Sequence, residues 1–118
     1  MKNIKLLTFD DLDVVNSFIN NNISDFSTFI NLGWSFKNIK EHFLKNNNFS
    51  LIYFHQKKVR GLLIGEIIES NSNEHQLEIH IIFVSKKIRR KNIGTEMLSF
   101  IEKNKSLINI SKIFLEVS

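Results

Sequence analysis

The amino-acid sequence predicts a single α/β domain of the α+β kind, in which a mixed, mostly antiparallel sheet is flanked by helices. Three apolar runs in succession, separated by short turns, indicate a meander of antiparallel strands. Other segments repeat apolar residues at helical spacing. A helix separates the last two strands, so we expect these to pair in parallel through a right-handed crossover. The expected order is β-α-α-β-β-β-α-β, in one domain spanning residues 1–118.

The first half of the chain is expected to form one strand and two helices. The strand covers residues 3–8, and Thr8 with Asp11 forms a capping-box pattern that begins the first helix. Residues 20–34 are rich in Asn and Ser and are expected to be a connector. Ser35 is expected to cap the second helix. The predicted apolar faces are Leu12, Val15, Phe18 and Ile19 in the first helix, and Phe36, Ile39, Phe43 and Leu44 in the second.

The second half contains the meander and the crossover. Strands are expected over residues 49–55, 59–70 and 76–84, joined by the turns QKK and NSNEH. The last strand is expected over residues 112–117. The crossover helix that precedes it has a predicted apolar face of Ile93, Met97, Leu98 and Ile101.

Composition excludes several kinds of chemistry. The chain has no Cys, which rules out disulfides, thiolate metal sites and cysteine nucleophiles. No spacing of His, Asp and Glu resembles a metal site, and His42 and His55 are expected at the surface. No apolar run approaches the ~20 residues that cross a bilayer, and the N-terminus turns acidic before any long apolar stretch, so we expect a cytoplasmic protein without a membrane partner. The net charge of +4 favours an anionic partner.

The segment VSKKIRRKNIGTEML, residues 84–98, combines a strand end, five Lys and Arg, and a helix start. The first N–H groups of a helix lack intrahelical acceptors, so Gly94 and Thr95 are suited to bind an anion. Asn92 stands where glycine would be easier, but it tolerates a left-handed conformation. A solvated basic loop explains the segment about equally well. Nucleic-acid binding is less favoured, because no aromatic residues lie between the cations.

Three segments together resemble the GNAT acetyltransferases. The loop Arg89-Arg90-Lys91-Asn92-Ile93-Gly94 is similar to that family's pyrophosphate loop, with Asn92 in place of its first glycine, and Val84, Met97 and Leu98 match its flanking positions. GWSFKNIKEHF (33–43) and IFLEVS (113–118) resemble segments of the ribosomal-protein-alanine N-acetyltransferases, the RimI type. The resemblance covers essentially the whole chain.

The resemblance implies transfer of an acetyl group from acetyl-CoA to an amine. By the RimI pattern, the acceptor would be a protein N-terminus, namely the N-terminal alanine of a ribosomal protein. The backbone of Ile82, Phe83 and Val84 would hold the pantetheine arm, with the N–H of Val84, at a strand bulge, polarising the thioester carbonyl. The amides of residues 90–95 would hold the pyrophosphate. The residues implied in cofactor binding are thus Ile82, Phe83, Val84, Arg89, Arg90, Lys91, Asn92, Ile93, Gly94 and Thr95.

The resemblance implies that Glu116 is the general base. Partial burial at the end of an apolar strand would raise the pKa of Glu116, although an ordinary surface carboxylate fits the sequence alone better. Glu78 and His80 alternate on one strand face, where they would contact substrate or form a plain half-exposed polar face. Residues 31–35, which include Trp34, are a candidate acceptor region.

The sequence departs from the family pattern at its C-terminal end. The family continues with a helix and two strands that supply an Asn and a proton-donating Tyr, and Tyr53 has no matching position. We therefore expect a C-terminally truncated fold in which the last strand is an exposed apolar edge. This leaves room for a strand-completing partner or a homodimer. The alternatives to an active enzyme are an impaired acyl-CoA-binding remnant that serves as a partner-binding module, and a small basic nucleic-acid-binding domain.

Overall fold

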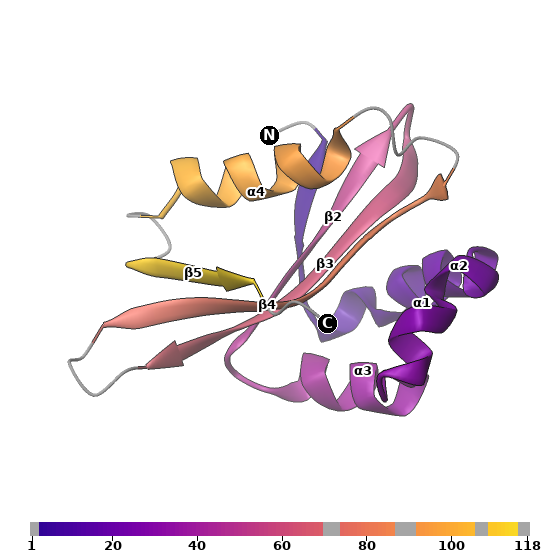
Figure 1. Cartoon of the computed structure of the whole chain (residues 1–118), viewed down its shortest axis with the longest axis horizontal. Coiled ribbons are helices and arrows are strands. Elements are labelled where there is room, and N and C mark those ends of the chain that lie inside the picture. The colour runs from indigo at the N-terminus through magenta and orange to yellow at the C-terminus, as the bar shows by residue number, and fades with distance from the viewer. Residues whose placement is uncertain (1–2, 70–73, 87–91, 106–108, 116–118) are drawn as a thin grey trace.

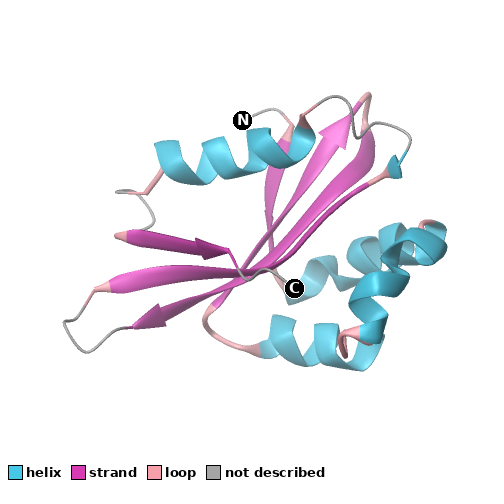
Figure 2. Ribbon diagram, in the orientation of Figure 1, coloured by secondary structure: helices cyan, strands magenta, loops and turns pink. Residues whose placement is uncertain are grey.

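The computed structural model describes residues 3–69, 74–86, 92–105 and 109–115. They form a sheet with helices on both of its faces (Figures 1 and 2). The elements in chain order are β1 (Ile4–Leu7), the 3-10 turn η1 (Phe9–Asp11), α1 (Leu12–Asn21), α2 (Ile23–Asn31), α3 (Phe36–Leu44), β2 (Asn48–His55), β3 (Lys58–Glu69), β4 (His75–Val84), α4 (Ile93–Lys103) and β5 (Lys112–Leu115).

The sheet has the predicted mixed topology. Its strand order is β1-β2-β3-β4-β5, and every neighbouring pair is antiparallel except β4 and β5, which are parallel. The hairpin between β2 and β3 turns at Gln56 and Lys57, whose φ angles of 52° and 66° are those of the turn that matches strand twist. The predicted fold class and the crossover through α4 are confirmed.

Each face of the sheet has its own apolar core. On one face, α4 packs Ile93, Met97 and Ile101 against the strands, as predicted, with Leu98 only partly buried. On the other face, α1, α2 and α3 pack over β2, β3 and β4 (Figure 1). The rings of Phe18 and Phe26 lie 5.5 and 5.1 Å from that of Phe83. Such aromatic pairs add to the apolar packing of this face.

The predicted connector at residues 20–34 is wrong, because α2 occupies Ile23–Asn31. Its apolar residues recur at helical spacing, and Phe26 is fully buried in the core. The Asn- and Ser-rich composition favoured a loop, but burial of Phe26 against Phe83 outweighs that weak local preference.

The predicted inner face of α3 is correct in its centre and wrong at its ends. Ile39 and Phe43 are buried, whereas Phe36 and Leu44 are 41% and 60% exposed. The third buried residue of α3 is His42. The Ser35 cap is as predicted, since its hydroxyl accepts from the Asn38 N–H at 3.2 Å. The Asp11 carboxylate accepts from the Thr8 N–H at 2.9 Å, but this pair begins the 3-10 turn η1, which leads into α1.

The described part of the last strand lies at a sheet edge, as predicted. Phe114 and Leu115 of β5 are 47% and 51% exposed. In the described ranges, no helix is both long and apolar enough to cross a membrane.

Candidate active site

Strand β4 extends beyond the pairing with β5. The last described pair of the two strands is Ile79 with Leu115, whereas the pairing of β4 with β3 continues to Val84. Figure 1 shows β4 running on past the described end of β5 toward the start of α4. In the described residues, Ile82 and Phe83 therefore have no β5 residue in register beside them. This is the stretch to which the resemblance assigned the pantetheine arm.

A β-bulge lies at His80 rather than at Val84. Ile64 pairs with Ile81 but Gly65 pairs with Ile79, which leaves His80 as the additional residue of β4. The pairing with β3 is regular from Ile81 onward to Val84, so the bulge expected at Val84 is corrected to His80. The bulge changes the face of β4 that odd-numbered residues occupy, because one extra residue shifts the period-two alternation.

The start of α4 lies beside β4. Asn92 precedes the helix with φ 58° and ψ 33°, the left-handed conformation that the sequence predicted for it. A Cβ built on Gly94 would lie 3.7 Å from Cγ2 of Ile82, so the first turn of the helix approaches the strand at this residue. Thr95 is exposed and Ile93 is buried. The first N–H groups and the positive dipole end of a helix are suited to an anion.

Four of the predicted site residues, Arg89, Arg90, Lys91 and Glu116, lie outside the described residues.

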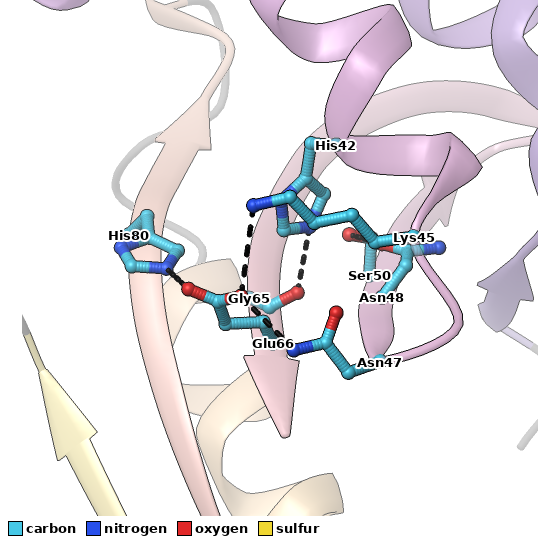
Figure 3. A network of polar contacts seen from close by, with 8 residues as sticks. All are labelled: His42, Lys45, Asn47, Asn48, Ser50, Gly65, Glu66 and His80. Atoms are coloured by element: carbon cyan, nitrogen blue, oxygen red, sulfur yellow. Dashed lines mark hydrogen bonds and ion pairs between the residues drawn. The ribbon is translucent and has the colours of Figure 1, made fainter. Parts of the chain in front are cut away.

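A polar cluster lies on the other side of β4, beneath α3. It is formed by Glu66 of β3 with Glu78 and His80 of β4, whose ligand-type atoms all lie within 4.8 Å of one another. His80 Nε2 donates to Glu66 Oε1 at 2.9 Å (Figure 3). Glu66 stands directly opposite Glu78 in the sheet, an arrangement that costs stability for two like charges.

Two further groups contact the Glu66 carboxylate. Asn47 Nδ2 donates to Oε2 at 3.1 Å, and Lys45 Nζ lies 3.9 Å from the same oxygen (Figure 3). Burial raises the pKa of Glu66, but the hydrogen bond from His80 and the charge of Lys45 outweigh it and hold the pKa below its ordinary value. Glu66 is therefore an anion at neutral pH.

His42 closes the cluster from α3. Its side chain is buried rather than at the surface, which corrects the prediction, and its Nε2 donates to the Gly65 carbonyl at 2.8 Å. Burial lowers the pKa of His42, and the hydrogen bond to Gly65 opposes this only in part, so the ring is neutral at pH 7. A Cβ on Gly65 would lie 2.8 Å from the Glu78 carbonyl oxygen, so only glycine fits beside the bulge.

Trp34 joins the cluster to a shallow cavity. Its ring lies 5.9 Å from that of His80 and 6.1 Å from that of His42. The cavity has a volume of about 370 Å³ and is lined by Leu32, Gly33, Trp34, Asn38, Glu41, His42 and Lys45. The predicted acceptor region, residues 31–35, thus borders the polar cluster.

Sequence reasoning identified Glu78, His80 and Trp34 as candidates but missed Glu66, Lys45 and Asn47. Glu66 is the only charged residue in the run GLLIGEII, and an isolated carboxylate in an apolar strand is a usable signal. Its contacts with residues 45 and 47 depend on the pairing of β3 with β2 and were not visible in the sequence. Chemically, the cluster has an excess of negative charge that suits an ammonium group, and it offers carboxylate and imidazole groups as proton acceptors.

Comparison with known proteins agrees with the fold. Residues 16–118 match the model of the acetyltransferase (GNAT) family. Among solved structures, the chain resembles a ribosomal-protein-alanine N-acetyltransferase from Brucella melitensis biovar Abortus 2308, with a TM-score of 0.77 and 13% identity over 98% of this chain and 79% of that one.

Two further structures show the same fold. One is an aminoglycoside acetyltransferase from an uncultured soil metagenomic sample, in complex with sisomicin (TM-score 0.73, 17% identity, 98% and 76% coverage). The other is a GNAT family acetyltransferase from Staphylococcus aureus (TM-score 0.72, 18% identity, 98% and 85% coverage). Comparison with curated protein sequences gives no match. The family match spans most of the chain, and the chain belongs to the GNAT family of acetyltransferases.

Proposed function

We propose that this GNAT-family chain acetylates the α-amino group of a protein N-terminus, and that its acceptor begins with alanine, as for a ribosomal protein. The observation that carries the proposal is the placement of two sites on one strand. The first turn of α4 approaches β4 at Ile82. Glu78 and His80 lie a few residues earlier on the same strand and form the polar cluster with Glu66 of β3, on the other side of β4. The anionic acetyl-CoA and the cationic N-terminal ammonium of the acceptor would thus bind near each other along β4.

The donor side of the proposal uses backbone groups. GNAT proteins use acetyl-CoA, whose thioester supplies an activated acetyl group. The amides of residues 90–95, at the start of α4, would hold its pyrophosphate, with Arg89, Arg90 and Lys91 adding charge. The backbone of Ile82, Phe83 and Val84 would hold the pantetheine arm, and the N–H of Val84 would polarise the thioester carbonyl.

The acceptor side of the proposal uses the polar cluster. An N-terminal ammonium entering past Trp34 would meet the carboxylates of Glu66 and Glu78, which favour a cation. The amine must lose a proton before its nitrogen attacks the acetyl carbon. Glu116 is the base that the resemblance implies. Glu78 and His80, which lie together in the cluster, are the described groups that we propose as the alternative proton acceptors.

The acetyl group would then pass from acetyl-CoA to the amine in a direct transfer. The new N–C bond forms as the C–S bond breaks, the amine proton passes to the base, and the thiolate of CoA leaves and is protonated by water. Since thiolate is a tolerable leaving group, the reaction proceeds without a positioned acid, although such an acid typically contributes ~10²–10⁴-fold.

Calorimetric titration with acetyl-CoA tests the donor site. We expect the parent chain to bind and Gly94→Glu not to bind, because the new carboxylate stands where the pyrophosphate would rest. Ser99→Glu is the matched control, since it adds the same charge farther along α4. A folded parent that does not bind acetyl-CoA, or a Gly94→Glu variant that binds as well as the parent, would contradict the proposed site.

The acceptor is tested by a screen with mass-spectrometric detection of product. Peptides beginning with alanine are compared with otherwise identical peptides that begin with other residues. An aminoglycoside is included as well, because one structural neighbour is an aminoglycoside acetyltransferase. Faster acetylation of the alanine peptides is expected. Faster acetylation of the aminoglycoside would contradict the proposed protein acceptor and indicate a small-molecule acceptor.

The alternative is an acyl-CoA-binding module that engages a partner through β5. The exposed Phe114 and Leu115 on a sheet edge favour this alternative, because such a strand is a template for pairing. It predicts acetyl-CoA binding without turnover of any acceptor, which the same two experiments detect.

A further inference from the structure

We propose that Glu66, Glu78 and His80 form a binding site for a divalent transition metal ion of the zinc type. The three side chains come from two adjacent strands, and their ligand-type atoms lie within 4.8 Å of one another. Ligands on a tetrahedral zinc ion lie about 3.4 Å apart, given bond lengths of about 2.0–2.2 Å. Side-chain rotations that move these atoms by about an ångström therefore bring them to coordinating positions.

The donor set selects the kind of ion. One imidazole nitrogen and two carboxylate oxygens are typical ligands of zinc, while magnesium and calcium prefer oxygen alone. Three protein ligands leave a fourth position open for water or another ligand, as in reactive rather than structural zinc sites. His80 Nε2 now donates its proton to Glu66 Oε1 at 2.9 Å, and in the proposed site the ion takes the place of that proton.

The local charge favours a divalent cation. Glu66 and Glu78 stand opposite each other across β3 and β4, where two negative charges repel. The Glu66 and His80 side chains are only 18% and 13% exposed, so water screens this repulsion less than at the surface. The lysine contact that the structure shows for Glu66 is Lys45 at 3.9 Å, at the outer limit of an ion pair. A divalent ion between the two carboxylates would remove the repulsion more completely.

The surroundings hold the ligands in place. Asn47 donates to Glu66 Oε2, and His42 donates to the carbonyl of Gly65, next to Glu66 in the chain. The Trp34 ring covers His80 at 5.9 Å. Ligands on central strands with such support are better fixed than ligands on loops, which lowers the cost of ordering them on binding.

The consequence for regulation rests on the proposed function. The ion would occupy the carboxylates that the acceptor ammonium uses, so zinc would compete with the acceptor and raise its KM. Zinc would not displace acetyl-CoA, whose proposed contacts are the far end of β4 and the start of α4. The site is thus a switch by which a free zinc ion stops acetyl transfer.

The test is zinc binding to the full chain without a polyhistidine tag, measured by competition with a chromophoric chelator and by the visible absorption of Co²⁺. We expect one ion per chain. Glu78→Gln and His80→Gln should each weaken binding by more than the roughly 10–100-fold typical of losing a group that only supports a ligand. His75→Gln and Glu69→Gln, two changes on the same strands outside the cluster, should leave it unchanged. Lys45→Met should tighten binding, because it removes a competing cation.

A folded parent chain that binds no zinc, or a His80→Gln variant that binds it equally well, would overturn the proposal. The readout needs neither acetyl-CoA nor acceptor, so it is independent of the proposed function. Zinc binding by a chain that does not bind acetyl-CoA would leave the metal site standing and the transferase proposal contradicted. Acetyl transfer by a chain that binds no zinc would support the transferase proposal and contradict the metal site.

Discussion

The two faces of the sheet differ in the ionisable side chains that they bury. On the α4 face, Ile93, Met97 and Ile101 meet an apolar strand surface that includes Leu77 and Ile79. On the α1–α3 face, the apolar packing around Phe26 gives way to the half-buried cluster of Glu66, Glu78 and His80. The first face holds α4 through these apolar contacts. The second keeps ionisable groups out of water, which costs free energy and is usual where a protein binds or reacts with something.

The bulge at His80 makes this difference. Before it, Leu77 and Ile79 point to the α4 face, and after it, Ile81 and Phe83 point to the α1–α3 face. The one extra residue lets β4 contribute Glu78 and His80 to the same face as its later apolar residues. Without the bulge, the period-two alternation would place one of these two sets on the opposite face.

The largest expected effect is on the apolar part of the α1–α3 face. Phe26→Ala should lower the free energy of unfolding by about 3–5 kcal/mol, because it removes a fully buried ring packed on Phe83. Urea denaturation measures this. Phe36→Ala, at a 41% exposed position, is the control and should cost less than about 1 kcal/mol. Equal losses would mean that α2 does not pack as described.

The next largest effect tests the hydrogen bond of His42 on the polar part of the same face. His42→Leu should cost about 1–3 kcal/mol of stability, because it removes the imidazole donor from the Gly65 carbonyl. His42→Gln keeps an N–H donor and should lose less. If thermal or urea unfolding gives the same loss for both variants, the hydrogen bond is not what His42 contributes.

Glu66→Gln should act on the acceptor rather than on the fold. Loss of the charge should raise the KM for the acceptor amine roughly 10–100-fold, the value of a hydrogen bond to a charged group, while the KM for acetyl-CoA stays the same. Steady-state kinetics with each substrate varied in turn measures both. Glu69→Gln, three residues later and exposed, serves as the control. An acceptor KM that does not change would remove Glu66 from the acceptor site.

The smallest effect lies outside both faces, at the cap of η1. The hydrogen bonds from Lys5 and from the Thr8 N–H hold the pKa of Asp11 below its ordinary value of 3.8. Because the folded pKa is the lower one, the stabilisation is present above pH 3.8 and is lost as the pH falls through the folded value. Asp11→Asn should therefore cost a few tenths of a kcal/mol at about pH 7 and almost nothing at about pH 2. A loss independent of pH would contradict this.

Sequence reasoning predicted the helices and strands that have a clear apolar pattern. It failed where composition obscured that pattern or where the contact depends on strands distant in sequence. The three apolar runs that form β2, β3 and β4, the turns between them and the helical spacing in α4 led to the correct topology. The helix α2 was missed because its Asn- and Ser-rich composition obscured the apolar residues whose spacing reveals it. His42 was placed at the surface, although its position on α3, between the buried Ile39 and Phe43, is an inward one.

The features of the site that depend on neighbouring residues in the sequence could be predicted, and those that depend on strand pairing could not. Asn92 was expected to stand in for glycine because Asn tolerates a left-handed conformation, and its φ of 58° is in that region. The cluster of Glu66 with Glu78 and His80 was not predictable as a unit, because Glu66 is distant in sequence from the other two and meets them through strand register. A shift of one residue in that register would send Glu66 to the other face.

Amide chemical shifts measured as acetyl-CoA is added to the isotope-labelled chain test the central claim most directly. We predict that the signals of Ile82, Phe83, Gly94 and Thr95 change most, and that those of β1 and β2 stay in place. Such a pattern would locate the donor along the far end of β4 and the start of α4. Changes centred elsewhere, or none at saturating acetyl-CoA, would contradict the account of how this chain binds its acetyl donor.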